Sequence, residues 1–334
     1  MPLACYAPPL DFANDRSQQS RPPNVKTVFL GTDDFPIPTL HALVAAKRAP
    51  DLVVTKADAP RGRGRKIYPQ RVRLVAEELG IPCEQPEDVL EPAFLERLRD
   101  FAPDLILVVS FGRILNDAFL KIPKQFCLNV HGSLLPKFRG ASPIAHAVLA
   151  GEELTGVTVQ KIALKLDTGP ILHRVETKIG KHEHAGELYN RLSKLAGDAL
   201  VQALEKVEAG DIDFVAQDDA KASRAPKLEK EQGFIDWEKE AVEIDRLVRA
   251  FTPKPGARTR FGPRKLILLE GRLEEDFFGL GMPGGVMTAG EEGIRVCTGR
   301  GIYRILRLKP ENGRNMTAGE FVRGHNFPPD ARFG

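Results

Sequence analysis

The chain has 334 residues, of which 42% are hydrophobic and 28% are charged, and its formal net charge is +3. The length predicts two domains with sizeable cores, and the composition is that of an ordinary globular protein. A net charge so close to zero excludes overall basicity as evidence for a polyanionic partner, so such a partner must be argued from where the charges lie.

Cysteine spacing and hydropathy exclude further classes of protein. The four cysteines, Cys5, Cys83, Cys127 and Cys297, are far apart and form neither a CxxC pair nor a Cys/His cluster. This spacing predicts no zinc site and no disulfide framework, and it fits a reducing compartment. No apolar run approaches the roughly 18 residues that a membrane-spanning helix needs.

Residues 1–24 are rich in proline, serine and glutamine and lack the apolar core of a secretory signal. Asp11 and Asp15 balance Arg16 and Arg21, whereas a transit peptide is rich in arginine and poor in acids. We expect a disordered N-terminal extension or a misassigned start, with organelle targeting as the alternative.

From residue 25 the sequence alternates between short apolar runs, which predict strands, and stretches with helical spacing of apolar residues. The expected strands cover 26–31, 52–57, 104–112, 127–132 and 170–179, and the expected helices cover 38–47, 70–79, 91–100 and 185–210. This alternation predicts an α/β fold with a Rossmann-like parallel sheet, covered by helices on both faces, over a first domain of residues 25–210.

In parallel sheets, ligands bind beyond the carboxyl ends of the strands. Three expected strand ends are therefore of interest, at 31–34, 110–112 and 129–133. The first of them reads GTDDFP where a dinucleotide-binding turn would read GxGxxG. One glycine and two acids suit an anionic pyrophosphate poorly, so the sequence argues against a nicotinamide or flavin cofactor.

The pattern changes after residue 210. A polar stretch over 211–228 predicts a linker, within which Phe214 and Val215 could pair as a strand. An expected helix over 241–251 is followed by short runs separated by glycine turns, at 257–261, 264–273, 284–290, 293–299 and 301–310. Closely spaced short strands are typical of small barrels, so residues 229–334 predict a second domain, an OB-like β-barrel.

Asn129 and His131 stand two positions apart at an expected strand end, so their side chains point to the same side. An amide N–H stabilises a developing oxyanion, and an imidazole moves protons near neutral pH. Asp167, in a later turn that reads LDTG, is suited to orient such an imidazole. GxSxG is absent, so the chemistry indicated is direct transfer to a nucleophile of the substrate. Spacing alone leaves a structural histidine as the alternative.

Several motifs together resemble the formyltransferases that use 10-formyltetrahydrofolate, and within them the family that formylates methionyl-tRNA. In the first domain these are FLGTDDFPIPTL, APRGRGRKIYP, SFGRIL, NVHGSLLPKFRGASPI and GVTVQKIALKLDTGPIL. In the second they are APKLEKEQGFIDW, AFTPKPGARTRF and GIYRILRLKPENGRNMTAGEF, so the resemblance covers nearly everything from residue 26 to 333. It implies transfer of a formyl group from the folate to the amino group of methionine on initiator tRNA.

The resemblance also implies roles for individual residues. Asn129, His131 and Asp167 would be catalytic, with Asn129 donating to the oxyanion and His131, held by Asp167, moving the proton. No metal is required. The residues expected to bind the folate co-substrate are Ser110, Ser133, Leu134, Leu135 and Pro136.

A basic glycine-rich run, RGRGRK at 61–66, is by itself typical of a solvated loop, although arginine and lysine also neutralise phosphates. The resemblance implies a tRNA contact at this run and a second contact on the C-terminal domain. The residues expected to bind tRNA are Arg61, Arg63, Arg65, Lys66, Arg246, Arg249 and Lys254.

Other functions stay open at this point. A related enzyme would formylate glycinamide ribonucleotide or a sugar nucleotide amine with the same three residues, and a hydrolase would discard the formyl group. Neither small acceptors nor hydrolysis needs the basic run or the second domain. A tRNA-binding protein without activity would not need all three catalytic residues. We expect a monomer in a bacterial cytoplasm, with the mitochondrial or plastid matrix as the alternative location.

Three further features are expected to be structural. The HEH run at 182–184 lacks additional metal ligands and is expected to form a surface turn. His146 is expected to pack or to face solvent. Cys127, beside the catalytic strand, is expected to be a buried apolar residue and not a nucleophile.

Overall fold

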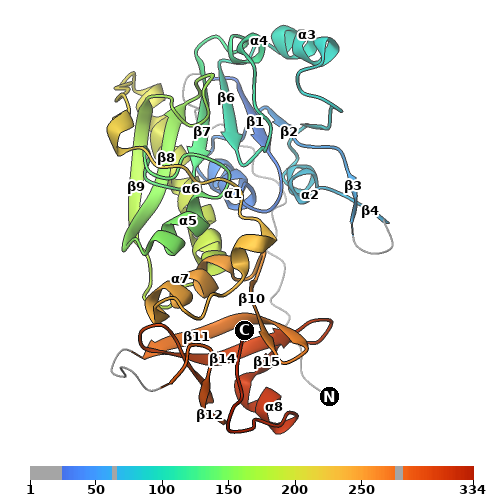
Figure 1. Ribbon diagram of the computed structural model, residues 1–334. Helices are drawn as coiled ribbons and strands as arrows, with labels where there is room; N and C mark the ends of the chain where they lie inside the picture. Colours follow the sequence, from blue (N-terminus) through green and yellow to red (C-terminus); the bar gives the residue numbers. More distant parts are fainter. Residues whose placement is uncertain (1–24, 62–65, 275–280) are drawn as a thin grey trace.

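The computed structural model describes residues 25–61, 66–274 and 281–334 (Figure 1). An α/β domain occupies the upper part of the figure and an antiparallel barrel the lower part, with helix α7 (Ala241–Phe251) between them. The predicted fold class is confirmed in both parts.

The first domain is built on a seven-stranded sheet in the order β5-β2-β1-β6-β7-β8-β9. The strands are β1 (Thr27–Gly31), β2 (Leu52–Val54), β5 (Cys83–Glu84), β6 (Leu105–Val109), β7 (Phe126–His131), β8 (Leu154–Lys161) and β9 (Ile171–Lys178). Five of them are parallel, as predicted, whereas β8 and β9 add an antiparallel edge. The connection 162–170 between β8 and β9 is too short for the crossover of roughly a dozen residues that a parallel pair requires.

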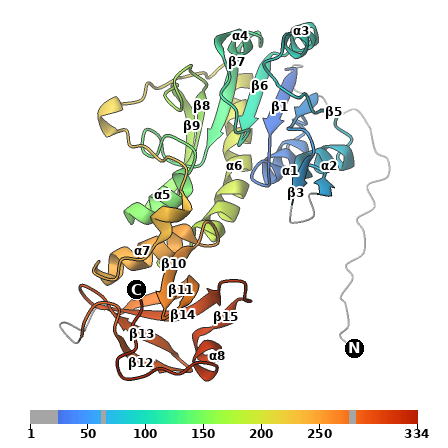
Figure 2. The ribbon, with the colours of Figure 1, turned by 45° about the vertical axis from the view of Figure 1, so that its right-hand side comes forward.

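Helices cover both faces of this sheet (Figure 2). One face carries α1 (Ile37–Ala45), α2 (Arg71–Glu78), α5 (Pro143–Ala150) and α6 (Ala185–Glu208), and the other carries α3 (Pro92–Phe101) and α4 (Asp117–Leu120). Within β1, Phe29 packs into the first hydrophobic cluster while Val28 and Leu30 pack into the second. Burial on both faces explains why these strands are continuous apolar runs without alternation.

Strands β3 (Ala59–Arg61) and β4 (Lys66–Tyr68) form a separate hairpin that projects from the domain beside α2 (Figure 1). The backbones of Arg61 and Lys66 pair at its outer end. The basic run at 61–66, where the sequence predicted only a loop, therefore begins and ends on these two paired strands.

The second domain is a six-stranded antiparallel sheet followed by α8 (Ala318–Arg323). Its strands are β10 (Ala257–Phe261), β11 (Arg264–Glu274), β12 (Val286–Gly290), β13 (Gly293–Cys297), β14 (Ile302–Pro310) and β15 (Met316–Thr317). The last residues of the chain bridge its two edges: Arg260 N donates to Gly334 O at 2.7 Å beside β10, and Phe333 N donates to Gly284 O at 2.8 Å beside β12. The predicted barrel is thereby closed.

The stretch predicted as a linker, 211–228, packs back onto the first domain. Val215 and Ile171 exchange two backbone hydrogen bonds of 2.8 and 2.9 Å, so the pairing expected near Val215 is confirmed. Farther along, Ala225 N donates to Arg139 O at 2.7 Å. The 3₁₀ turns η1 (Asp219–Lys221) and η2 (Lys230–Gly233) complete the path to the second domain.

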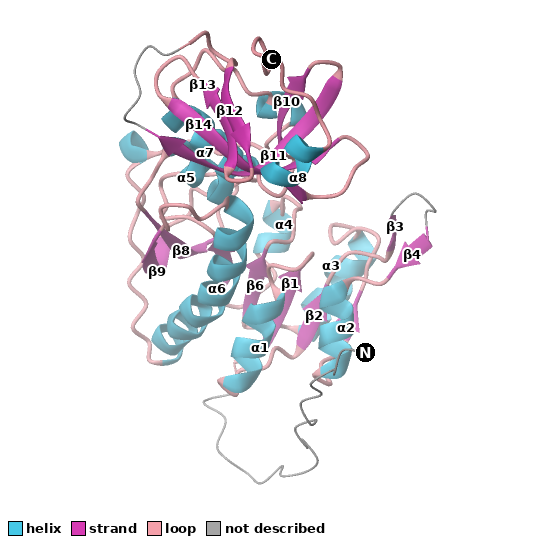
Figure 3. Ribbon diagram, turned by 90° about the horizontal axis from the view of Figure 1, so that it is seen from below, coloured by secondary structure: helices cyan, strands magenta, loops and turns pink. Residues whose placement is uncertain are grey.

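Helix α7 connects the two domains. Its buried residues Ile244, Val248 and Phe251 belong to a hydrophobic cluster that continues from the sheet domain into the barrel. Its Arg249 pairs with Asp245 at 2.7 Å. Figure 3 shows α5 and α7 next to the barrel strands. Among the residues that the structure describes, no helix has the length and apolar character needed to cross a bilayer.

Candidate active site

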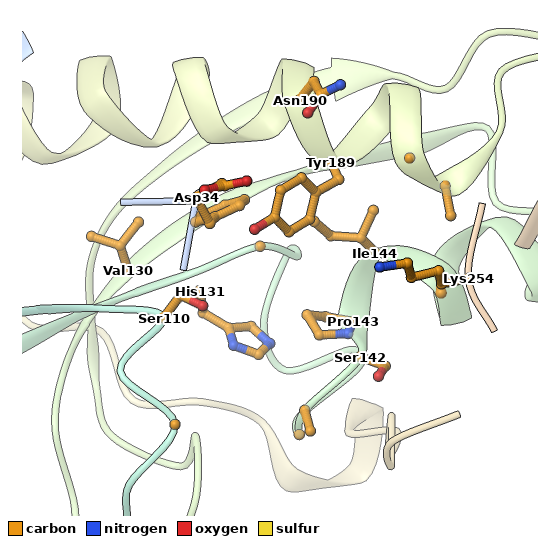
Figure 4. A pocket seen from close by; sticks show the side chains of 18 of the residues that line it. Asp34, Ser110, Val130, His131, Ser142, Pro143, Ile144, Tyr189, Asn190 and Lys254 are labelled. Atoms are coloured by element: carbon orange, nitrogen blue, oxygen red, sulfur yellow. The ribbon is translucent and has the colours of Figure 1, made fainter. Parts of the chain in front are cut away.

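The carboxyl ends of the parallel strands β1, β6 and β7 meet at one edge of the sheet, and a cavity of about 1010 Å³ opens there. Each of the three strand ends singled out in the sequence contributes to its wall. Asp34 follows β1, Ser110 follows β6, and His131 ends β7 (Figure 4).

His131 is held by a backbone group on one side and faces a carboxylate on the other. Its Nε2 lies 2.9 Å from the carbonyl oxygen of Phe138, and its Nδ1 lies 3.7 Å from Oδ2 of Asp167. Because a carbonyl oxygen only accepts, Nε2 must carry a proton, and the neutral ring then has its lone pair on Nδ1. The side chain is only 7% exposed, so the ring has one proton-accepting atom with a defined direction.

Asp167 lies in the loop between β8 and β9, and two hydrogen bonds fix its carboxylate. Its Oδ2 accepts from the backbone N–H of Gly140 at 2.9 Å, and its Oδ1 accepts from Nε2 of Gln160 at 3.1 Å. The carboxylate is therefore oriented before any substrate binds, and it would stabilise a proton on the facing Nδ1 of His131.

Asn129 lies on the same side of β7 as His131, since the two are separated by one residue. In the sheet it pairs with Val108 of β6 and Gln160 of β8, and it lines the cavity. Within the described part of the chain no side-chain hydrogen bond engages its amide. The amide is thus available to donate to a ligand.

Three residues around this centre have a left-handed backbone although they carry side chains: Ser110 (φ 48°), Phe138 (φ 62°) and Asp167 (φ 53°). Such conformations cost energy, persist only where the surroundings hold them, and are enriched at functional sites. Gly140 has φ 129°, and a Cβ there would lie 2.6 Å from the carbonyl oxygen of Ala225. Glycine is therefore required for the close approach that lets its N–H reach Asp167.

The expected folate-binding residues divide into two groups. Ser110 lines the cavity. The other four residues, Ser133, Leu134, Leu135 and Pro136, do not line it. They lie against Thr158 of β8, whose Oγ1 donates to Ser133 O at 2.6 Å and accepts from Leu135 N at 3.1 Å. This places them as supports of the loop that carries Phe138, and their contact with folate stays a prediction.

The opposite wall of the cavity comes from residues that, apart from Lys254, the sequence did not indicate as site residues. The start of α6 contributes Tyr189 and Asn190, the end of α7 leads to Lys254, and α5 contributes Ile144 (Figure 4). Burial raises the pKa of Tyr189 to about 12, so its phenol stays neutral. Tyr189 and Asn190 lie in none of the motifs found in the sequence, because they reach the cavity only through the packing of the helices.

The expected tRNA-binding residues are placed in two regions. Arg61 and Lys66 end the strands of the β3–β4 hairpin, whereas Arg63 and Arg65 lie outside the described residues. Lys254 is exposed and lines the cavity. Arg246 packs against Gly151 at the end of α5. Arg249 is committed to Asp245 and also reaches the carbonyl of Glu183 at 3.4 Å. Their contact with tRNA stays a prediction.

The three features expected to be structural are accounted for. His184 caps α6 by accepting from the N–H groups of Gly186 and Glu187, both at 3.1 Å, so the HEH run is a helix-capping turn. His146 bonds to the carbonyl of Pro226 at 2.9 Å. Cys127 is buried, as expected, and burial raises the pKa of its thiol to about 12. Among the described residues no three His, Cys, Asp or Glu side chains are grouped to hold a metal ion.

Comparison with protein families gives two matches along the chain. Residues 26–204 match formyl transferase, and residues 227–326 match the formyl transferase C-terminal domain. The methionyl-tRNA formyltransferase of Geobacter metallireducens is 40% identical over 307 residues, which cover 92% of this chain and 98% of that protein. That of Halorhodospira halophila is 42% identical over 308 residues, covering 91% and 97%.

Solved structures share the fold at low sequence identity. HypX from Aquifex aeolicus in complex with tetrahydrofolic acid superposes with a TM-score of 0.61 and 18% identity, covering 89% of this chain and 46% of that one. An N-formyltransferase from Helicobacter canadensis, in complex with folinic acid and dTDP-3-aminofucose, gives a TM-score of 0.63 and 17% identity, covering 88% and 100%. At these identities the likeness establishes the fold.

Proposed function

The chain belongs to the methionyl-tRNA formyltransferase family, and from this premise we propose that Asn129, His131 and Asp167 carry out its reaction in the cavity at the strand ends. The reaction transfers the formyl group of 10-formyltetrahydrofolate to the α-amino group of methionine on initiator Met-tRNA. The observation that carries the proposal is the placement of His131 between the Phe138 carbonyl and the Asp167 carboxylate, with the Asn129 amide lining the same cavity.

Each of the three residues has a defined part in the reaction. The methionyl nitrogen attacks the formyl carbon, and the C=O electron pair moves to oxygen, where the Asn129 N–H donates to the oxyanion. The attacking nitrogen loses its proton to Nδ1 of His131, whose positive charge faces Asp167. The oxyanion then re-forms the C=O bond, the bond from carbon to N10 of the folate breaks, and N10 takes up the proton.

No nucleophile of the protein is required in this sequence of steps. The thiol of Cys127 is buried with a pKa of about 12, which disfavours the thiolate that covalent catalysis would need. The hydroxyl of Ser133 donates its proton to the carbonyl oxygen of Lys137 at 2.8 Å. It is therefore not directed at His131, the base that would have to activate it as a nucleophile. The formyl group therefore passes directly from donor to acceptor.

The lining of the cavity favours a macromolecular acceptor, because the cavity extends to the start of the second domain. Lys254, between α7 and the barrel, lies on the wall opposite His131. A strand-end site for a small amine would not need this wall. We place the tRNA along the barrel side and the β3–β4 hairpin, with its aminoacyl end in the cavity, and assign Arg61, Arg63, Arg65, Lys66 and Lys254 to its phosphates.

Three further properties complete the proposal. Residues 229–334 act as the tRNA-binding domain and residues 25–210 as the catalytic domain. We also propose that the enzyme works as a monomer. It works in the cytoplasm of a bacterial cell, because the relatives compared are bacterial proteins; the mitochondrial or plastid matrix is the alternative.

A panel of acceptors tests the function. Purified protein and 10-formyltetrahydrofolate are combined in parallel with initiator Met-tRNA, elongator Met-tRNA and glycinamide ribonucleotide. We expect rapid transfer to initiator Met-tRNA and little to the other two. Transfer to glycinamide ribonucleotide alone would contradict the assignment of the second domain, and equal transfer to both tRNAs would contradict the specificity for the initiator.

A further inference from the structure

Gln217 lies in the segment between the two domains, yet its side chain is bonded to the loops that hold the catalytic pair. The segment is anchored on either side of it. Val215 pairs with Ile171 at the start of β9, and Arg139 N donates to Ser223 O at 2.9 Å. Gln217 is thereby placed between the Asp167 loop and the loop that follows His131.

The side-chain amide of Gln217 is satisfied at both ends. Its Nε2 donates toward Asp167 O at 2.9 Å, Gly169 O at 2.7 Å and Gln160 Oε1 at 3.0 Å. Its Oε1 accepts from the guanidinium of Arg139 at 3.0 and 2.8 Å. Backbone carbonyls only accept and a guanidinium only donates, so the orientation of this amide is determined by its partners.

These bonds connect Gln217 to both sides of the pair formed by His131 and Asp167. On one side, Gln217 holds the main chain of Asp167 and sets the amide of Gln160, which in turn donates to Oδ1 of Asp167. On the other side, Arg139 stands between Phe138, whose carbonyl holds His131, and Gly140, whose N–H holds Asp167.

The conformation of the Asp167 loop needs such support. Asp167 has φ 53°, and the Cβ of any residue at position 169 would collide with the carbonyl oxygen of Lys161. A left-handed aspartate is held only when its surroundings determine it. The short loop 162–170 ends with Gly169 and Pro170, and the two carbonyls that Gln217 binds, those of Asp167 and Gly169, lie on either side of Thr168.

We propose that Gln217 is a positioning residue for formyl transfer, which keeps the Asp167 loop and the Phe138–Gly140 loop at the separation that His131 requires. This inference rests on the proposed function and deepens it, since it assigns part of the catalytic geometry to the segment that joins the catalytic domain to the barrel. Gln217 acts through Gln160, Arg139 and the backbone of Asp167, and it does not line the cavity.

Two substitutions separate the bonds of Gln217 from its volume. Gln217→Met keeps the length of the side chain and removes every hydrogen bond. Gln217→Glu keeps acceptors for Arg139 and replaces the donor with an anion facing three oxygen atoms. Gln202→Met is the matched control, because Gln202 is an exposed glutamine on α6 that bonds to His173 away from the cavity.

In formylation of initiator Met-tRNA, we expect Gln217→Met to lower kcat about 10- to 100-fold, the range in which displacements near 1 Å act, while both KM values change by less than about threefold. Gln217→Glu should lose at least as much, and Gln202→Met should match the wild type. An unchanged kcat in Gln217→Met would overturn the inference.

A double-mutant cycle distinguishes positioning from general support of the fold. If Gln217 acts through Asp167, Gln217→Met should cause little further loss of single-turnover rate in an Asp167→Ala background. The same fold-loss in both backgrounds would show that Gln217 acts elsewhere and would overturn the inference.

A readout without substrate keeps this inference separate from the proposed function. In protein labelled with ¹⁵N-histidine, the imidazole signals of His131, assigned with His131→Asn, should shift in Gln217→Met and stay in place in Gln202→Met. Unshifted His131 signals in Gln217→Met would contradict the proposal that Gln217 positions the loops around His131. Absence of formylation by the wild type would instead contradict the proposed function, and the histidine spectrum would still decide the role of Gln217.

Discussion

Nδ1 of His131 and Oδ2 of Asp167 face each other at 3.7 Å, while Nε2 of the same ring is bonded to the carbonyl of Phe138 at 2.9 Å. This arrangement leaves the ring one atom that can exchange a proton with a substrate, and it places a carboxylate where the resulting charge appears. The side chains of both residues are less than a tenth exposed. In the proposed reaction, this pair transfers the proton at a fixed position next to the amide of Asn129.

Replacing His131 tests the proton transfer. His131→Asn should lower kcat about 10²- to 10⁴-fold, the usual contribution of a positioned acid or base, and leave the affinity for tRNA nearly unchanged. Steady-state formylation and a filter-binding titration measure the two effects. His173→Asn on β9 is the control, because that imidazole bonds to Gln202 away from the cavity. A near-normal rate in His131→Asn would remove its assigned role.

Asn129 is expected to act only after the formyl carbon has been attacked. Asn129→Ala should lower kcat about 10²- to 10³-fold, as the loss of one oxyanion donor does, with little effect on folate affinity. Single-turnover rates and a folate-binding titration give both values. Asn326→Ala, an exposed asparagine of the second domain, serves as the control. A large loss of folate affinity with an unchanged rate would instead make Asn129 a binding residue.

The ion pair between Asp245 and Arg249 should stabilise the junction of the domains. The two side chains are 6% and 16% exposed and lie on α7 beside the cavity wall. Asp245→Ala leaves a largely buried guanidinium without its counter-ion, which should cost about 3 kcal/mol of unfolding free energy. Urea unfolding measures it. The exposed pair Lys239–Glu243 near the same helix provides the control, since Lys239→Ala should cost about 0.3 kcal/mol. Equal costs would contradict a structural role for Arg249.

Asp104 predicts a pH-dependent contribution to stability. Its carboxylate accepts from the N–H of Lys26 at 2.7 Å, and this bond is the main cause that lowers its pKa from the ordinary value of 3.8. A carboxylate with a lowered folded-state pKa stabilises the protein above 3.8, and that stabilisation is lost as pH falls through the folded-state value.

Asp104→Asn should therefore be less stable than the wild type by about 1 kcal/mol at pH 7, and the difference should shrink below pH 3.8. Urea unfolding at pH 7 and at pH 3 measures both differences. Asp100→Asn, an exposed carboxylate on α3, is the comparison. A difference for Asp104→Asn that is constant with pH would show that its charge has no part in stability.

Much of the fold could be predicted from the sequence because local patterns coincide with the elements. The run ARTRF at 257–261 is strand β10, and the helical spacing at 185–210 is helix α6. Strand β8 was not predicted, since only Val157 and Val159 are strongly apolar among its buried residues 155–160, so the stretch is not a continuous apolar run. The β3–β4 hairpin was also missed, because three residues a strand are too few to give a period.

The candidate site divides in the same way. Asn129, His131 and Asp167 were candidates from their residue types and spacing, but only the resemblance of the motifs decided between a catalytic and a structural histidine. The supports of the site could not be found. Gln217 and Gln160 are 57 positions apart, and composition marks the segment around Gln217 only as polar. The sequence of a polar segment is the same whether its polar groups bond to water or to the rest of the protein. Only the folded structure distinguishes these two cases.

The central claim is that the formyl group passes directly between two substrates at His131 and Asn129. A rapid-quench experiment with excess enzyme, 10-formyltetrahydrofolate labelled in the formyl group and initiator Met-tRNA tests it most directly. We predict that label disappears from the folate and appears on the methionyl α-nitrogen at one rate, with none on the protein at any time. Label that appears first on the protein, or that is released as formate without reaching the tRNA, would contradict the account.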